Sequence, residues 1–514
     1  MRTDNKSKVN EIIVIGGGMG GLFTGALLAK EGFRVTVLEK NPSIGGGLQS
    51  FRRLGKSFDT GMHILGGFKN DGTVFKICNY LGIIDKLKIK DVDHDCMDQI
   101  TFLSDNRTFR VPEGKENFTA YFQGEFPEEM DNIRNYVEKL FALADEMPLF
   151  RLITDKDGDL AHDEWFFKPA DEFIRHFIKN PKLREVLSYM NPLCGGMAGH
   201  TPAYIFALIN VLYINGQSRF AGAAKQLAEA LTWVIETNSG KVICNETVSE
   251  VVIEDKEVKH VVTSRGNTYQ ADIYISAIHP SSFLKLTDSK LFTKAYRNRI
   301  NQTENTYSAF TIYVKLKPDS LKYINHPCYV QKDYEKSWAH GEYDESNWPR
   351  TLIYLTPCSE SQGEYAETME ILSLMPFSAC ERWAETTAGS RGKDYEDWKK
   401  CQAMKMFKIM DRVIPGFENH IDGYFTSSPL TIRDFYNEPD GALYGIVKDC
   451  DRLQHGYVPI RTKAVNLLQT GQNVNLHGCC GVPITAINTA ETIVGANSIV
   501  EKINRAFCNT ALSD

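Results

Sequence analysis

Three apolar segments follow one another within the first forty residues, and glycines separate the first two. Residues 12–15 form a continuous apolar run, residues 16–21 include five glycines, and residues 22–29 are mostly small or apolar. A further apolar run, 35–38, ends at the carboxylate of Glu39. Short apolar runs are typical of buried strands and longer ones of helices, so this order predicts a strand, a glycine turn, a helix and a second strand.

Periodic patterns continue through the rest of the chain. Apolar residues at helical spacing predict helices over 131–144, over 170–189 and around 227–234. Runs rich in β-branched residues predict strands at 241–245, 246–253, 258–263, 271–280, 309–316 and 370–376. Segment 202–214 is apolar nearly all round but too short to cross a bilayer. It is interpreted as a core helix, as the wall of an apolar tunnel, or as both.

The first strand, turn, helix and second strand have the order and spacing of a dinucleotide-binding unit. Gly16 permits the tight turn, Gly18 lets the backbone approach a pyrophosphate, and Gly21 lets the helix pack on the strand. The helix N-terminus then offers free N–H groups to the phosphates. Glu39 is placed to accept hydrogen bonds from a ribose, and its charge disfavours the 2′-phosphate of NADP. A glycine-rich surface loop is the alternative interpretation.

A second glycine cluster distinguishes a flavin from a nicotinamide cofactor. Gly45, Gly46 and Gly47 follow soon after the ribose acid, and the segment 58–67 adds three more glycines. NAD does not need a second cluster. The long ribityl and isoalloxazine part of FAD must pass close to the backbone, so the second cluster favours FAD.

Composition narrows the class of partner. The chain has 514 residues, which suggests about two or three folding units, and 42% of them are hydrophobic. Its formal net charge is −7 without a long basic block, so we expect no nucleic-acid partner. The first ten residues lack the apolar centre of a secretory signal. The twelve cysteines form no C-x-x-C pair, which predicts reduced thiols in a cytoplasm.

Two further segments resemble binding motifs but fail on spacing. Residues 195–199 are glycine-rich, yet no apolar strand precedes them, so a second nucleotide site is rejected. Residues 155–159 resemble a calcium loop, but the glycine and the closing glutamate are misplaced, which favours a charged surface turn. We therefore expect no metal site.

The combined motifs resemble the phytoene desaturase branch of the FAD-dependent, amine-oxidase-like flavoproteins. The segment 58–63, Phe-Asp-Thr-Gly-Met-His, is most similar to the retinol saturase and carotenoid isomerase subgroup. The resemblance returns at 216–231, where the family's glycine pair is weakened to Gly222-Ala223. One departure is clear: many relatives carry an arginine after the double glycine, where this chain has Gly47-Leu48. Any contact of that arginine with a phosphate or the flavin is therefore absent here or supplied by another residue.

The resemblance implies an α/β fold. It consists of a Rossmann-type FAD-binding domain, glutathione reductase-like and amine-oxidase-like, with an inserted mixed α+β substrate domain. We assign 1–68, 216–296 and 460–514 to the discontinuous FAD-binding domain, and 69–215 and 297–459 to the substrate domain.

The C-terminal segment 474–487 is predicted to form a strand, a turn and a helix, with Pro483 in the first helical turn. The resemblance implies that this helix N-terminus faces the N1–C2=O edge of the flavin and stabilises its reduced form. It also implies an adenine contact through the backbone of Val248, and that Asp272 leads toward the diphosphate. The candidate cofactor-binding residues are Gly16, Gly18, Met19, Gly20, Gly21, Glu39, Lys40, Gly46, Gly47, Leu48, Gly61, Met62, His63, Val248, Ala277, Gly478, Gly481, Val482, Pro483 and Ile484.

Four residues carry candidate chemistry. His63 follows the Gly61-Met62 turn and is the candidate catalytic residue, as a general acid or as an orienting group. His477 could carry a covalent flavin link, although an unlinked histidine is favoured. The neighbouring Cys479 and Cys480 are interpreted as small packed side chains in preference to a redox pair.

The resemblance implies hydride transfer between flavin N5 and a carbon of an apolar substrate such as a carotenoid, retinoid or other isoprenoid. Saturation, desaturation and isomerisation of a C–C or C=C bond remain open, and 58–63 favours saturation or isomerisation. The electron donor or acceptor is unknown, and a peripheral membrane contact is considered. The alternatives are an amine-oxidase-like reaction on a C–N bond and a non-catalytic protein that binds flavin or lipid.

Overall fold

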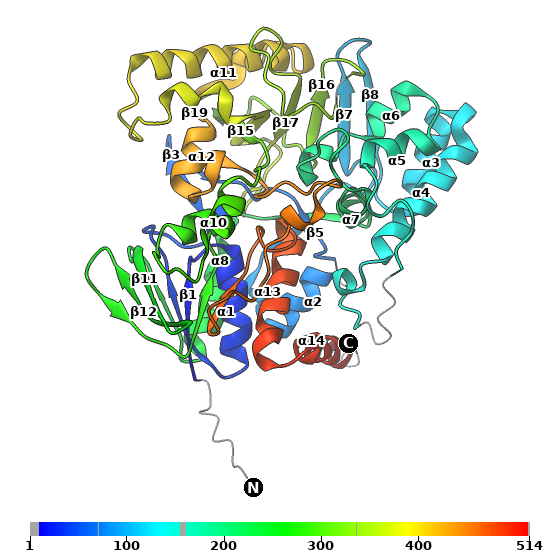
Figure 1. The fold of residues 1–514 in the computed structure, drawn as a ribbon. Helices are drawn as coiled ribbons and strands as arrows, with labels where there is room; N and C mark the ends of the chain where they lie inside the picture. The colour runs from blue at the N-terminus through cyan, green and yellow to red at the C-terminus, as the bar shows by residue number, and fades with distance from the viewer. Residues whose placement is uncertain (1–9, 70, 155–160, 336, 512–514) are drawn as a thin grey trace.

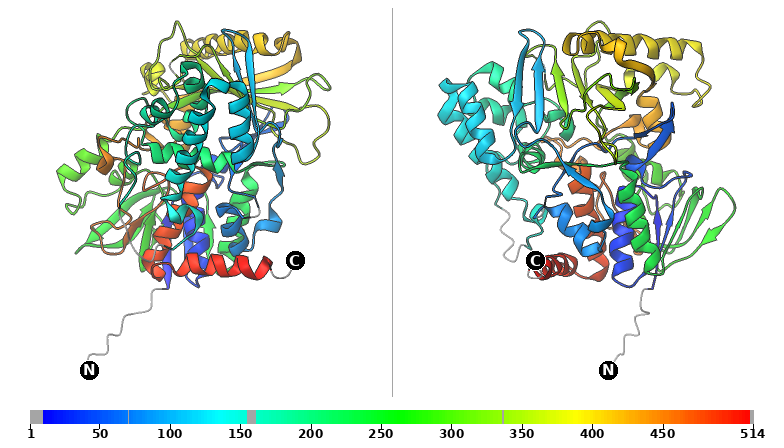
Figure 2. Two further views of the ribbon diagram at one scale, coloured as in Figure 1. Left: turned by 90° about the vertical axis from the view of Figure 1, so that its right-hand side faces the viewer. Right: turned by 180° about the vertical axis from the view of Figure 1, so that it is seen from behind.

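A computed structural model describes residues 10–69, 71–154, 161–335 and 337–511. The charged turn predicted at 155–159 lies outside the described residues. Two sheets dominate the fold, one in the lower half of Figure 1 and one in the upper half, and both views of Figure 2 show the same two layers.

The lower sheet has five parallel strands in the order β10-β2-β1-β14-β20. These strands are Lys241–Ile243, Arg34–Leu38, Glu11–Ile15, Ile273–Ser276 and Leu467–Gln469. Along the chain, α1, Met19–Lys30, joins β1 to β2, as the hydrophobic pattern predicts. The parallel order and the glycine turn after β1 confirm the predicted Rossmann-type fold, which binds ligands at the carboxyl ends of its strands.

Helices cover this sheet and form one apolar core with it. The helix α1 packs against α8, Lys225–Thr237, and against α13, Gly478–Val494. Because neighbours surround it, α1 is apolar on every side, as expected for a helix inside a core. The helices α2, Thr73–Leu81, and α14, Ser498–Ala511, pack on each other and on α13. An antiparallel ribbon, β11-β12-β13, lies beside the sheet over Val248–Glu254, Glu257–Thr263 and Thr268–Tyr269.

The upper sheet has seven strands in the order β19-β15-β18-β17-β16-β7-β8. They span Ile421–Ser427, Ser308–Leu316, Thr368–Met375, Thr351–Leu355, Cys328–Gln331, Asp98–Phe102 and Arg107–Val111. Only the β16–β7 pair is parallel among these neighbours. One face packs on α11, Lys393–Val413, through a third apolar core. Successive side chains alternate between faces, so the other face is free to line a site.

A helical layer flanks β7 and β8 and builds a further apolar core. Its helices are α3, α4, α5, α6 and α7, over Lys115–Glu125, Met130–Asp145, Ala170–Phe177, Pro181–Leu187 and Ala203–Ile214. The continuous helix predicted over 170–189 is wrong, because the chain breaks before Pro181. Proline has no N–H to continue α5, and Asn180 instead caps α6 by accepting from the N–H groups of Lys182 and Leu183.

Smaller elements connect the two layers. The hairpin β3–β4 spans Ser50–Arg53 and Lys56–Asp59, and a short sheet joins β5, β9 and β6 at Leu65–Gly66, Gln217–Phe220 and Ile89–Asp91. Three helices complete the fold: α9, Pro280–Leu284, α10, Lys294–Asn301, and α12, Pro429–Tyr436. No helix within the described ranges is both long and apolar enough to cross a membrane.

The C-terminal strand and helix begin at different residues from those predicted. The strand expected at 474–477 is wrong, since β20 ends at Gln469 and 474–477 form no strand. The helix α13 begins at Gly478, so Pro483 lies inside it and not in its first turn. The positive φ of Gly478, 79°, lets the chain turn into the helix there. Pro483 then leaves the carbonyl of Cys479 without its helical N–H partner.

Candidate functional site

A cavity of about 640 Å³ lies between the two layers. One side is formed by the carboxyl ends of β1, β2 and β14, and the other by the upper-sheet face that turns away from α11. Its volume is in the range of small-molecule and cofactor sites. Most of the candidate cofactor residues line this cavity; the three that do not are Gly21, Pro483 and Ile484.

Gly18 and Gly21 occupy different surroundings in the glycine turn. A Cβ placed on Gly18 would meet nothing within 4 Å, so Gly18 faces open space at the start of α1. A Cβ on Gly21 would collide with the carbonyl oxygen of Gly16. Gly16 itself has a φ of 105°, a conformation that favours glycine. The free N–H groups of α1 therefore point at a space suited to an anion, while Gly21 permits close packing.

Glu39 is tied to the same turn. Its side chain is 6% exposed, its Oε2 accepts from the N–H of Gly17 at 2.7 Å, and its Oε1 accepts from the N–H of Asn41 at 2.8 Å. A carboxylate has about four acceptor sites, so both oxygens retain capacity for a further donor. Glu39 therefore links β2 to the glycine turn and still offers a polar edge to the cavity that it lines.

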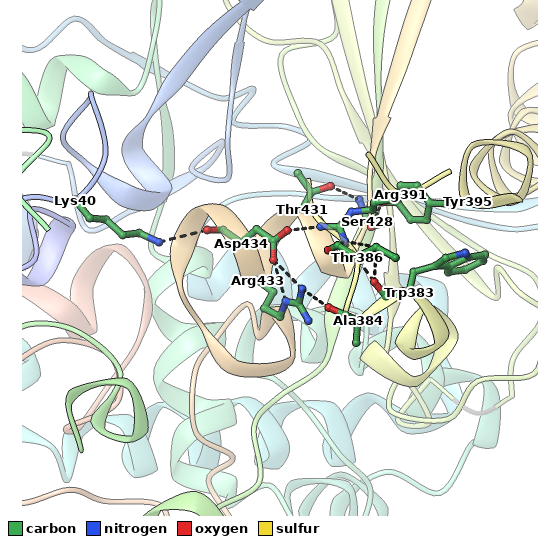
Figure 3. Close-up of polar contacts among 10 residues, drawn as sticks. All are labelled: Lys40, Trp383, Ala384, Thr386, Arg391, Tyr395, Ser428, Thr431, Arg433 and Asp434. Atoms are coloured by element: carbon green, nitrogen blue, oxygen red, sulfur yellow. Dashed lines mark hydrogen bonds and ion pairs between the residues drawn. The ribbon is translucent and has the colours of Figure 1, made fainter. Parts of the chain in front are cut away.

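The helix α12 contributes Ile432, Phe435 and Tyr436 to the cavity lining. Figure 3 shows the polar contacts that connect this helix with Lys40 and Arg391. Lys40 donates to the backbone carbonyl of Asp434 at 3.3 Å, and burial lowers the pKa of Lys40. The Asp434 carboxylate is ion-paired with Arg391 and Arg433. Arg391 is nearly buried and also donates to the carbonyl of Thr386 at 2.7 Å. Sequence patterns carry no signal for the contact between Lys40 and Asp434, because these residues are 394 positions apart.

Many relatives carry an arginine after the double glycine, but no arginine is among the described residues that line the cavity here. The cations that line the cavity are the lysines Lys40 and Lys285, and the histidines His63 and His477 also lie there. Asp272 lies at the opposite end of β14, where its carboxylate accepts from the N–H groups of Asn10 and Glu11. Only the carboxyl end of β14, with Ala277, reaches the cavity.

The start of α13 faces the cavity through Gly478, Cys479, Cys480, Gly481 and Val482. Burial raises the pKa of both thiols, and thiolates are the reactive form of cysteine. These properties favour the packed-side-chain interpretation over a redox pair.

His477 precedes α13 and is held in place from the other side of the cavity. Its Nε2 lies 3.2 Å from the carbonyl oxygen of Leu193, which accepts from the ring N–H. Burial lowers the pKa of His477 to about 4, so the ring is neutral at physiological pH. The imidazole is therefore oriented by a backbone carbonyl at the wall of the site.

The remainder of the cavity is mainly apolar. The helix α7 contributes Ile209, Leu212 and Tyr213, while its first residues, from Ala203 to Leu208, are buried in the helical core. Segment 202–214 is therefore a core helix whose C-terminal half also lines the cavity. The strands of the upper sheet contribute nine residues to the described lining, which are Ala309, Thr311, Tyr313, Tyr329, Ile353, Leu355, Leu372, Leu374 and Ser427.

A histidine and a carboxyl group meet at this apolar end. Nε2 of His63 lies 3.2 Å from Oε2 of Glu370, which is on β18 and almost fully buried. Burial lowers the pKa of His63 to about 4 and raises that of Glu370 well above its usual value. Glu370 was missed from the sequence, although a carboxylate in an otherwise apolar strand pattern is the signal that could have identified it.

Comparison with known proteins connects this geometry to a family. The family model described as flavin containing amine oxidoreductase matches residues 19–350, more than half of the chain. The all-trans-retinol 13,14-reductase of Rattus norvegicus is 25% identical over 95% of this chain and 86% of its own length. Prolycopene isomerase 2 of an Oncidium hybrid cultivar is 24% identical over 89% of this chain and 78% of its own length.

Among solved structures, putrescine oxidase bound to putrescine has a TM-score of 0.63 and 13% identity, over 94% of this chain and 99% of its own. At that identity the likeness shows the fold alone. The two sequence relatives cover most of both chains, so the resemblance read from the motifs is confirmed along nearly the whole length.

Proposed function

The chain belongs to the flavin-containing amine oxidoreductase family and is an FAD-dependent oxidoreductase of the phytoene desaturase and retinol saturase type, and we propose that it acts on a C–C or C=C bond of an apolar isoprenoid or polyene. The observation that carries this proposal is the single cavity that joins the glycine turn to an apolar chamber. One end suits a nucleotide and the other suits a long substrate with few polar groups.

FAD fits the residues present. We propose that the N-terminus of α1 holds the diphosphate over Gly18, that Glu39 accepts from the ribose, and that Val248 lies against the adenine. Bound FAD supplies a two-electron carrier that exchanges a hydride through N5. The start of α13 presents backbone N–H groups at the same cavity and favours negative charge there. Gly21, Pro483 and Ile484 support the turn and the helix without lining the cavity.

The two domains proposed from the sequence would each supply one end of the site. The five-stranded sheet comes entirely from 1–68, 216–296 and 460–514, and the seven-stranded sheet from 69–215 and 297–459. However, α2, at Thr73–Leu81, packs with α13 and α14, so we propose that the FAD-binding unit also includes this helix.

The apolar wall supports an isoprenoid or polyene substrate. The relatives named for retinol and prolycopene suggest saturation or isomerisation, as segment 58–63 does. Saturation would require an electron donor, whereas isomerisation would require only transient reduction of the flavin. Specificity would rest on the shape of the chamber, since apolar molecules offer few groups to hydrogen-bond.

The amine-oxidase alternative calls for a lysine close to the flavin ring. The lysines in the described lining are Lys40 and Lys285. Lys40 follows Glu39, and Lys285 precedes Leu286, whose carbonyl accepts a hydrogen bond from the N–H of Val251 on β11. Both therefore lie toward the proposed adenosine end. Lys448 is buried outside the lining and donates to the carbonyl of Gly456. The C–C reaction is therefore the better supported of the two.

We further propose that the protein is cytoplasmic and contacts a membrane surface at the cavity rim. Phe435 lines the cavity and yet is 56% exposed, so its ring could insert into a lipid layer at the rim. Sedimentation with phospholipid vesicles would retain the wild-type protein more than Phe435→Ser. Equal recovery of both proteins in the supernatant would refute the membrane contact.

Flavin content and substrate class are tested on the purified holoprotein. The visible spectrum should show bound FAD, and anaerobic reduction should give a flavin that retinol or prolycopene reoxidises or that isomerises one of them. An amine substrate that reduces the flavin directly would move the assignment to the C–N reaction. A flavin that neither class of compound can cycle would support the non-catalytic alternative.

A further inference from the structure

One carboxyl group interrupts the apolar, cavity-facing surface of the upper sheet. Glu370 lies on β18 two and four residues before Leu372 and Leu374, both of which line the cavity, so the three share a face. Across the neighbouring strands, Glu370 pairs with Tyr313 of β15 and Leu355 of β17, which also line the cavity. An acid in the middle of such a surface is costly unless it has a partner or a function.

The partner comes from the other layer of the molecule. His63 belongs to the segment after β4, and its Nε2 lies 3.2 Å from Oε2 of Glu370. The two side chains are 16% and 1% exposed. Among the described residues, neither oxygen of Glu370 completes a hydrogen bond of good geometry, and the polar groups that face this carboxyl are the imidazole of His63 and the backbone N–H of Asp59. His63 lines the cavity and Glu370 does not, so Glu370 reaches the site through His63.

The charged and titratable groups around the pair favour its uncharged form. Burial is the largest effect and raises the pKa of Glu370; the carboxylate of Asp59 on β4 raises it further, whereas the backbone N–H of Asp59 and the charge of Arg219 on β9 lower it. Burial lowers the pKa of His63, and Arg219 lowers it further. Tyr313 of β15 and Tyr436 of α12 face Glu370, and burial raises the pKa of both phenols. Burial therefore favours the form of the pair in which the carboxyl group is protonated and the imidazole is neutral.

This arrangement leaves one ring nitrogen free. When Glu370 donates to Nε2, the proton of the neutral ring lies on Nδ1. Within the described part of the chain, no residue forms a hydrogen bond with Nδ1 of His63. The pair thus holds one proton on the carboxyl group and a second on a nitrogen of a cavity-lining ring.

We propose that His63 and Glu370 form a two-residue proton relay for the C–C chemistry, in which His63 exchanges a proton with a substrate carbon and Glu370 is the positioning residue behind it. This inference rests on the proposed function. Saturation of a C=C bond needs a hydride, which two-electron-reduced FAD supplies, and a proton, which forms the second new C–H bond. The relay identifies the source of that proton.

The proton transfers balance. The Nδ1–H bond of His63 breaks as a C–H bond forms on the substrate, and the O–H bond of Glu370 breaks as an N–H bond forms at Nε2. His63 ends neutral in its other tautomer, and Glu370 ends as a carboxylate. A solvent proton then restores Glu370 and the starting tautomer. Desaturation would run the same transfers in reverse, with oxidised FAD accepting the hydride.

The decisive variant is Glu370→Gln, because the amide still donates to Nε2 but holds no transferable acid proton. The matched control is Glu367→Gln, three residues earlier, where the side chain is 57% exposed and paired with Lys56. His63→Gln removes the relay at the cavity. All proteins should retain FAD, as seen in the visible spectrum.

The first readout does not depend on turnover. In infrared difference spectra at neutral pH, a protonated-carboxyl band should disappear in Glu370→Gln and persist in Glu367→Gln. With ¹⁵N-labelled histidine, His63 should show the Nδ1–H tautomer in the wild type and in Glu370→Gln, and should lose that preference in Glu370→Leu. Absence of the protonated-carboxyl band, or a tautomer that does not respond to Glu370→Leu, would overturn the relay.

The second readout uses all-trans-retinol and prolycopene as probes. Glu370→Gln should lower the rate of the C–C reaction by about 100-fold with an unchanged KM, and Glu367→Gln should behave as the wild type. Wild-type rate and pH profile in Glu370→Gln would overturn the proposal. If the wild type converts neither probe although its FAD can be reduced, the proposed function fails, and the infrared and NMR results still decide whether the proton pair exists.

Discussion

At the scale of single residues, the glycine turn separates binding from folding. Gly18 faces open space at the N-terminus of α1, whereas Gly21 is packed against the backbone of Gly16. The two positions are three residues apart and would be indistinguishable by composition. Their roles therefore differ through geometry: Gly18 leaves space for a ligand, whereas Gly21 allows the helix to pack closely against the backbone of Gly16.

A pair of alanine substitutions tests this division. Gly18→Ala should fold normally, because its Cβ meets no protein atom, but should weaken FAD binding at least tenfold by occupying space near the phosphates. Gly21→Ala should instead lower the melting temperature of the FAD-free protein, because its Cβ collides with a backbone oxygen. Calorimetry of the FAD-free proteins and flavin titration measure the two effects. Wild-type FAD affinity in Gly18→Ala would contradict the assigned phosphate site.

Buried histidines give a second prediction at this scale. His340 lies outside the cavity lining, its Nε2 donates to Oδ1 of Asn191 at 2.9 Å, and burial lowers its pKa to about 4 from 6.5. At pH values between about 4 and 6.5, His340 binds a proton in the unfolded chain but not in the folded chain. The stability associated with neutral His340 is therefore complete above pH 6.5 and is lost as the pH falls toward 4.

His340→Gln should remove this pH dependence. Relative to the wild type, the variant should gain about 3 kcal/mol in unfolding free energy between pH 7 and pH 4. Urea unfolding of the FAD-free proteins measures the difference, with the exposed His94→Gln as the control. Parallel stability curves for His340→Gln and the wild type would show that the ring titrates normally.

At the scale of elements, α12 joins the two layers beside the proposed ribose site. Its last residues line the cavity, and the carbonyls of Asp434 and Phe435 accept from Lys40 and from Asn41 in the segment after β2. The helix is held from behind by the ion pair of Asp434 with the nearly buried Arg391. The position of α12 over the cavity therefore depends on a charge pair that lies outside it (Figure 3).

Breaking this pair should loosen the cofactor. Asp434→Ala leaves Arg391 buried without its carboxylate, a change that typically costs about 3–5 kcal/mol when the pair is fully buried. We expect a lower melting temperature and an FAD dissociation rate raised about tenfold or more. Asp422→Ala, which removes an exposed pair with Lys315, is the control. Unchanged dissociation in Asp434→Ala would mean that α12 does not hold the cofactor.

At the scale of the whole molecule, the sequence predicted what is local in the chain. The glycine turn and the strand-helix-strand unit around it follow from a pattern within the first forty residues, and the Rossmann-type fold that they predict is confirmed. The contact between His63 and Glu370 joins positions more than 300 residues apart, and periodicity carries no signal for it. The start of α13 was misplaced because proline is favoured in a first helical turn, yet Gly478 begins the helix earlier.

The arrangement of the two layers explains how one cavity can be lined by both the proposed cofactor site and the proposed substrate site. The parallel strands of the lower sheet place the glycine turn at their carboxyl ends, on one side of the cavity. Side chains alternate between the two faces of the upper sheet, and its apolar face turns toward the cavity from the other side. Neither layer alone encloses the chamber. The proposed chemistry therefore belongs to the interface between the layers, where the N-terminal His63 segment approaches the start of α13.

The most direct test is an anaerobic single turnover of the reduced holoprotein with all-trans-retinol and, separately, prolycopene. The proposal predicts either that the product gains two hydrogens for each FAD reoxidised, or that the product is a double-bond isomer while the flavin stays reduced. Retinol and prolycopene recovered unchanged, with a flavin that only an amine and its imine can cycle, would contradict it.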